Sequence, residues 1–171
     1  MSVFQPIKAA ICVVLSVAAF TATAEELPQP TGDIILTVSG NVSKVNSDAG
    51  AVFDLEMLEA YEQVTIETST IWTEGVQVFT GVNLATLLED LGITEGTLQA
   101  TAINDYAVAI PVADVEPGGA TIAYLLNGET MSVRDKGPLW IVFPYDSDPK
   151  YQAEVIYGQS IWQLDRIVVG E

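Results

Sequence analysis

The chain has 171 residues, of which 49% are hydrophobic, and a formal net charge of −17 at pH 7. This is the length of a single domain, and the apolar content is that of a packed globule rather than a disordered tail. The acidic excess disfavours binding to nucleic acid or anionic lipid, because both carry negative charge.

Residues 1–24 have the features of a secretory signal peptide. Lys8 precedes an apolar run over 9–20, and Ala22-Thr23-Ala24 supplies the small residues that a signal peptidase requires. The run is too short to cross a bilayer as a helix. The leader also lacks a pair of arginines, which favours Sec-type export of an unfolded chain. We expect cleavage before Glu25, a periplasmic or secreted protein, and no membrane insertion afterwards.

The sequence beyond this leader contains neither cysteine nor histidine, since the single cysteine is Cys12 and the histidine count is 0. This excludes thiolate nucleophiles, disulfides, Cys/His zinc sites and His-based catalytic triads there. With Lys8 removed, five basic residues remain against 23 acidic ones, a formal charge of −18.

The first half predicts two strands and two helices. A flexible lead-in over 25–32 is followed by the domain proper, 33–171, which opens with a strand over 33–42. Asp54 can cap a short helix, and 63–68 alternates as a strand. The clearest helix covers 84–91, where leucines recur at helical spacing between an N-cap at Asn83 and a terminating Gly92.

The second half predicts mainly strands. One hairpin joins 97–103 to 106–110 through Asn104-Asp105, and another joins 122–126 to 129–133 through Asn127-Gly128. The apolar stretch 139–143 is typical of a central strand, and 162–169 is a last strand. The sequence therefore predicts one mixed, strand-rich α+β domain.

Four segments and a closing strand occur in a distinctive order: VFTGVNLATLL (78–88), NDYAVAIP (104–111), IAYLLNGETM (122–131), GPLWIVFP (137–144) and WQLDRIVV (162–169). Their order and spacing resemble the molybdopterin-binding domain of the sulfite oxidase family of oxidoreductases. The resemblance implies that fold, and a cleft in which a cysteine thiolate binds the molybdenum of a pyranopterin cofactor. It places the corresponding position near Ser69.

The resemblance also implies a set of cofactor-binding positions, which are Ser69, Asn104, Asp105, Tyr106, Arg134, Lys136 and Trp140. Several depart from the family pattern. A serine replaces the cysteine, Trp140 replaces an arginine that would contact phosphate, and Asp105 replaces a glycine. An added carboxylate near a phosphate lowers affinity. We therefore expect no metal site and no catalytic residue, with molybdopterin retained only as an alternative cofactor.

The basic pair in Arg134-Asp135-Lys136 is the natural place for an anionic group to bind, unless both cations pair with nearby acids. Trp72, Tyr106 and Trp140 could wall a pocket beside it, whereas Trp162 is expected in the core. The stretch Asp146-Ser147-Asp148 is too short for a calcium loop and is interpreted as a solvated turn.

These features favour an exported small-ligand-binding or accessory domain over a catalyst. The expected partner is a small anionic ligand, or a periplasmic or membrane sensor protein, and no nucleic acid. The alternative is a molybdopterin-dependent oxidoreductase with a metal ligand other than cysteine, in which Ser69 and Arg134 would be critical. A purely structural role without a ligand also remains open.

Overall fold

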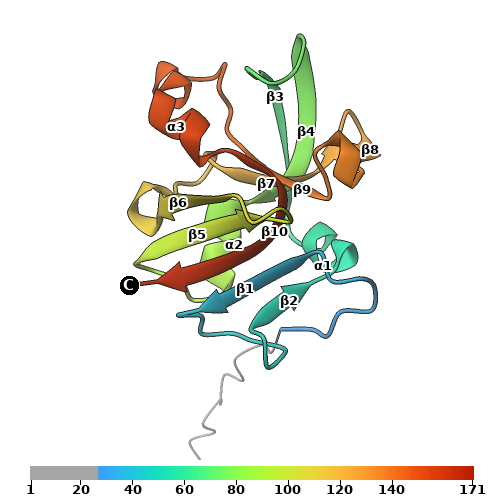
Figure 1. The fold of residues 1–171 in the computed structure, drawn as a ribbon, viewed down its shortest axis with the longest axis vertical. Helices are drawn as coiled ribbons and strands as arrows, with labels where there is room; N and C mark the ends of the chain where they lie inside the picture. The colour runs from blue at the N-terminus through green and yellow to red at the C-terminus, as the bar shows by residue number, and fades with distance from the viewer. Residues whose placement is uncertain (1–26) are drawn as a thin grey trace, which may run out of the picture.

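The computed structural model describes residues 27–171, which form a strand-rich mixed sheet with few helices (Figure 1). This agrees with the expected α+β class. The strands are β1 (Leu36–Gly40), β2 (Ala51–Phe53), β3 (Gln63–Ser69), β4 (Val76–Asn83), β5 (Thr97–Ala102), β6 (Ala107–Pro111), β7 (Thr121–Leu126), β8 (Glu129–Thr130), β9 (Leu139–Val142) and β10 (Ile161–Gly170). The helices are α1 (Leu55–Glu59), α2 (Leu84–Asp90) and α3 (Glu154–Gln159), with short 3₁₀ turns η1 (Val112–Asp114), η2 (Val133–Asp135) and η3 (Pro149–Gln152).

The last strand ties the sheet together. The main path runs β2-β1-β10-β9-β7-β4-β3, while β5 pairs with β10 and β6. The strand β10 pairs with β9 through its first residues and lies between β1 and β5 through its later ones. Its pairing with β1 is parallel, whereas the other strand pairs are antiparallel. Leu164 and Ile167 of β10 are fully buried, so this strand also supplies part of the core.

The predicted helix over 84–91 is confirmed as α2. Its N-cap is Asn83, whose side-chain oxygen accepts a hydrogen bond from the Ala85 N–H at 3.0 Å. Leu84 and Leu87 are fully buried, as their helical spacing predicts. The helix ends at a C-cap on Leu91, and Gly92 follows with φ of +67°, a left-handed conformation that glycine adopts without strain.

Both predicted hairpins are confirmed, although the second is shorter than expected. β5 pairs with β6 across Asn104-Asp105, and β7 pairs with β8 across Asn127-Gly128. The strand β8 has only two residues, because the chain turns into η2 where a strand through Val133 was expected. β9 lies between β10 and β7 with every residue buried, as predicted for a central strand.

The N-terminal stretch expected to be a flexible lead-in is held against the domain over residues 27–32. The backbone N–H groups of Thr31 and Gly32 donate to the Asp54 carboxylate at 2.6 and 2.7 Å, and Leu27 is buried. Asp54 therefore fixes this segment as well as capping α1, where it accepts from the Met57 N–H. The predicted signal peptide lies outside the described residues.

Candidate ligand-binding site

An aromatic cleft of about 520 Å³ opens where four separate segments meet. It lies between the turn joining β3 to β4, the turn joining β5 to β6, helix α3 and the start of β10. Figure 1 shows α3 and the β3–β4 hairpin in the upper part of the molecule. Its lining residues are Ile71, Trp72, Ala102, Asn104, Tyr106, Glu154, Tyr157, Gly158, Ser160, Ile161 and Trp162. The size and the mainly apolar lining are those of a small-molecule site.

Trp72 is the centre of the aromatic wall. Its ring lies 5.9 Å from the ring of Tyr157 and 5.7 Å from that of Trp162, both edge to face. It also contacts Tyr145 and Trp140 at ring distances of 6.2 and 6.1 Å. Edge-to-face contacts at these distances are favourable. The wall is therefore formed by mutual packing before any ligand arrives.

Tyr106 is the most exposed aromatic side chain of the cleft, at 57%. It follows the turn between β5 and β6, where the Asn104 side chain accepts a hydrogen bond from the Tyr106 N–H at 3.2 Å. The left-handed conformation of Asp105, with φ of +66°, makes this tight turn possible. An exposed ring on a fixed turn can contact a ligand without first leaving a packed core.

The polar side chains of the cleft differ in whether they already have hydrogen-bond partners within the protein. Ser160 is already bonded, because its hydroxyl lies 2.6 Å from that of Tyr145 and donates to the Ile156 carbonyl. Burial raises the pKa of Tyr145 to about 12, so this phenol stays protonated at neutral pH. The Glu154 side chain is exposed and makes no hydrogen bond or ion pair within the described part of the chain. It is therefore the carboxylate that remains available to a ligand.

Ser69, the expected metal-ligand position, is bonded to a carboxylate instead. Its N–H and its hydroxyl both donate to Asp146, the hydroxyl at 2.8 Å, and the Asp146 N–H donates to the Thr68 hydroxyl. These bonds, first that of the Ser69 backbone, lower the pKa of Asp146. A negative charge beside the Ser69 hydroxyl opposes its conversion to an alkoxide, the form that would bind a metal.

Three more expected binding residues, Arg134, Lys136 and Trp140, also lie outside the lining of the cleft. Arg134 is exposed, and Trp140 is fully buried with no hydrogen-bond partner for its indole N–H among the described residues. The Lys136 ammonium lies 5.8 Å from the ring centre of Trp140 and 5.9 Å from that of Trp162. Lys136 thus contacts the back of the aromatic cluster, within cation–π range, rather than the cavity.

Gln163 positions the turn that carries Lys136. Its N–H donates to the Lys136 carbonyl at 3.0 Å, and its side-chain amide donates to the Val133 carbonyl at 2.6 Å. Its own carbonyl accepts from the Ile103 N–H, next to the Asn104 turn. Gln163 has a left-handed φ of +55° at an irregularity in the pairing of β10. No sequence signal marked this residue.

The expected site residues are therefore only partly brought together. Asn104 and Tyr106 line the cleft, and the expected pocket residue Trp72 joins them, whereas Trp140 does not. Asp105 instead pairs with Arg166 of β10, the strand next to β5. Trp162, expected in the core, is half-buried and lines the cleft. Glu154 and Tyr157 were missed because helix α3 was not predicted.

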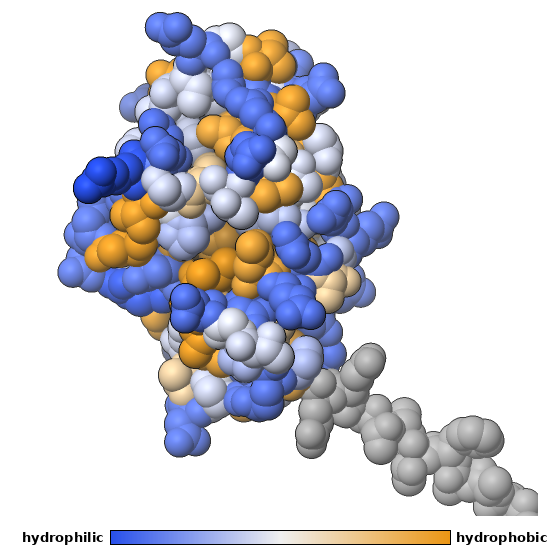
Figure 2. Space-filling model, turned by 90° about the vertical axis from the view of Figure 1, so that its right-hand side faces the viewer, coloured by the Kyte–Doolittle hydropathy of each residue, from blue (hydrophilic) through white to orange (hydrophobic). Residues whose placement is uncertain are grey.

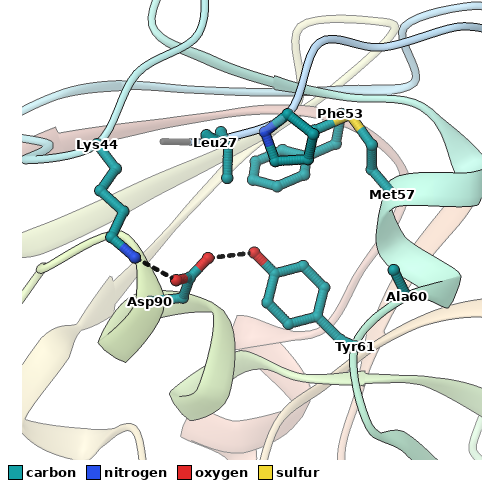
Figure 3. A pocket seen from close by; sticks show the side chains of 8 residues that line it. Leu27, Lys44, Phe53, Met57, Ala60, Tyr61 and Asp90 are labelled. Atoms are coloured by element: carbon teal, nitrogen blue, oxygen red, sulfur yellow. Dashed lines mark hydrogen bonds and ion pairs between the residues drawn. The ribbon is translucent and has the colours of Figure 1, made fainter. Parts of the chain in front are cut away.

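A second cavity, of about 420 Å³, contains the ion pair of Lys44 and Asp90 (Figure 3). The Asp90 carboxylate lies between the Lys44 ammonium and the Tyr61 hydroxyl, at 2.6 Å from each. Burial and the Asp90 carboxylate raise the pKa of Tyr61. Burial alone would also raise the pKa of Asp90, but the hydrogen bonds from Lys44 and Tyr61 outweigh burial and lower it. Each group is stabilised in its ordinary protonation state, which suits a structural role rather than proton transfer.

The charges of residues 27–171 are arranged so that most cations are already paired. Lys44, Lys150 and Arg166 each lie within ion-pair distance of a carboxylate, whereas neither Arg134 nor Lys136 has such a partner among these residues. Polar residues cover most of the face seen in Figure 2, with apolar patches between them. The unpaired charge of the molecule is thus overwhelmingly negative.

The described residues contain no group of three or more Cys, His, Asp or Glu side chains placed to hold a metal ion. Within the same residues, no helix has the length and hydropathy needed to cross a bilayer. No model of a known protein family matches the sequence, and no curated protein matches it significantly.

Proposed function

We propose that this chain is an exported small-ligand-binding domain that has the molybdopterin-binding fold of the sulfite oxidase family but does not hold molybdenum. The observation that carries the proposal is the aromatic cleft. Side chains from four segments form its wall, and the Ser160 hydroxyl in its lining is already bonded within the protein.

The donor set explains why the cleft would not bind a pyranopterin molybdenum centre. Ser69 would have to give up its bonds to Asp146 and lose a proton next to that carboxylate. No lysine or arginine of the described residues lines the cleft, so a phosphate group would meet Glu154 without a balancing cation in the lining. The residues present therefore do not fit the cofactor.

A binding domain without catalytic groups would act by changing its interactions when the ligand is bound. The cleft is bordered by α3 and by the β3–β4 hairpin, which projects from the sheet in Figure 1. A ligand between them would stabilise their relative positions, and a sensor or accessory partner could recognise the result.

Metal and pterin analysis tests the cofactor-free part of the proposal. The mature protein should be purified from the compartment to which it is exported, in a host that makes molybdenum cofactor. We expect no molybdenum above background by elemental analysis and no pterin fluorescence after oxidation. One molybdenum and one pterin per chain would refute the proposal.

A thermal-shift screen of small molecules tests the binding part. A ligand at 100 times its dissociation constant adds about 2.7 kcal/mol to the stability of the folded state. We expect compounds that raise the unfolding temperature of the wild type and lose this effect in Tyr106→Ala. The control is Ile34→Ala, which truncates a side chain of similar exposure, 54%, outside the cleft. Compounds that raise the unfolding temperature of Tyr106→Ala as much as that of the wild type would show that they bind outside the cleft.

A further inference from the structure

Resting on the proposed function, we propose that the ligand of the aromatic cleft is an organic cation with an alkylated ammonium group. The first reason is the aromatic lining. Four rings reach the cavity from four segments: Trp72, Tyr106, Tyr157 and Trp162. Aromatic faces attract cations electrostatically, and several rings around one cavity are the usual means of recognising quaternary ammonium groups.

The second reason is the charge of the lining. Among residues 27–171, Glu154 is the only carboxylate in the lining, and no lysine or arginine of this range belongs to it. Glu154 is exposed and unpaired within residues 27–171, in contrast to Glu116, which pairs with Lys150 at 2.6 Å. A cation would gain one carboxylate and lose no existing ion pair, whereas an anion would face Glu154 without compensation.

The third reason is the charge of the whole molecule. The part that follows the predicted leader has a formal charge of −18, and three of its five cations are already paired with carboxylates. The resulting negative potential raises the local concentration of small cations and lowers that of anions. It therefore acts in the same direction as the lining.

Removing the charge of Lys136 should have opposite effects on the binding of a cationic and an anionic ligand. Its ammonium lies over Trp162, which also lines the cleft, but Lys136 is not a lining residue. Its positive charge would repel a cation in the cleft and attract an anion. Lys136→Met keeps an unbranched side chain against the indoles and removes this charge, so it should tighten cation binding and weaken anion binding.

Three probes of the same shape but different charge test the proposal: choline, 3,3-dimethylbutan-1-ol and 3,3-dimethylbutanoate. Binding is followed by tryptophan fluorescence at low ionic strength, with heteronuclear NMR as the second measurement. We expect choline to bind about fivefold more tightly than the neutral alcohol, the range that cation–π attraction provides. The carboxylate should bind most weakly.

Two charge-neutralising variants locate the effect. Glu154→Gln should weaken choline binding about threefold and leave the neutral alcohol unchanged. Glu95→Gln is the matched control, because Glu95 is exposed and unpaired among the described residues. Glu95 precedes β5 whereas Asn104 follows it, and the two ends of this strand are about 20 Å apart. It should change neither affinity. Lys136→Met should tighten choline binding by a factor of about two.

The outcomes separate this inference from the proposed function. If the alcohol or the carboxylate binds as tightly as choline, with affinity that depends on Tyr106, the cationic assignment is wrong and the binding function stands. If none of the three binds at about 10 mM, the cationic assignment is also wrong, and the thermal-shift screen decides the binding function independently. Tighter carboxylate binding that Lys136→Met abolishes would instead support an anionic ligand.

Discussion

At the scale of single residues, Asp54 joins the N-terminal segment to the first helix. One carboxylate oxygen accepts from Thr31 and Gly32, and the other accepts from Met57 at the start of α1. These bonds, with that of Gly32 largest, lower the pKa of Asp54 below its ordinary 3.8. The side chain is 2% exposed, so few solvent contacts compete with them.

The lowered pKa of Asp54 predicts a pH-dependent contribution to stability. The stabilisation is fully present above the unfolded-state pKa of 3.8 and is lost as pH falls through the lower folded-state value. Asp54→Asn should therefore reduce the free energy of unfolding at neutral pH, by an amount that shrinks in acid. Urea unfolding at several pH values measures this. Glu59→Gln, a charge loss on the same helix without a described hydrogen bond, is the control. An equal deficit at every pH would contradict the assignment.

Gly81 has no space for a side chain. A Cβ there would lie 2.0 Å from the Ile122 carbonyl oxygen and 2.6 Å from the Ala123 Cα, where the pairing of β4 with β7 shifts register. These are backbone atoms of a neighbouring strand and cannot move independently of the sheet. The glycine in the segment 78–88 is therefore required by strand packing rather than by ligand binding.

Gly81→Ala should lower the free energy of unfolding by about 3 kcal/mol, because overpacking forces backbone shifts. Gly158→Ala is the matched control, because its Cβ would meet nothing within 4 Å and Gly158 lies inside helix α3. That change should stabilise the protein by about 0.5 kcal/mol through helix propensity. Chemical denaturation measures both, and a tolerated Gly81→Ala would show that the strands can separate locally.

At the scale of elements, α2 is specified locally by its ends and by its buried face. Asn83 caps it and is 5% exposed, while the Asn83 side-chain N–H group lacks a partner among the described residues. Asn83→Ala should cost about 1 kcal/mol, the usual loss of an N-cap. Asn83→Ser should cost less, because it keeps an accepting oxygen and removes the unpaired donor. Thermal unfolding of both variants tests this order, and equal losses would contradict it.

Elements with strong local signals were predictable from sequence, and those without were not. Asn127-Gly128 marks a hairpin because both residues tolerate positive φ, here +54° and +84°. Helix α3 lacks such signals, because its N-cap Ala153 makes no side-chain cap bond and Gly158 interrupts its six residues. The strand β4 was missed because Gly81 breaks its pattern of apolar residues.

At the scale of the whole molecule, the site depends on contacts between distant parts of the chain. Trp72 and Trp162 lie 90 positions apart in sequence, yet their rings are 5.7 Å apart. Their meeting requires β10 to cross the centre of the sheet, which no local pattern encodes. For the same reason, sequence predicted Trp72 and Tyr106 as pocket residues but assigned Trp162 to the core and Trp140 to the pocket.

The most direct test follows the indole N–H resonances of the three tryptophans during ligand titration of the ¹⁵N-labelled mature protein. Trp72 and Trp162 line the cleft, whereas Trp140 is fully buried behind it. We expect a ligand found by screening to shift the Trp72 and Trp162 signals most, and we expect Tyr106→Ala to reduce these shifts. A ligand that leaves both signals in place while shifting resonances around Lys44 and Tyr61 would contradict it.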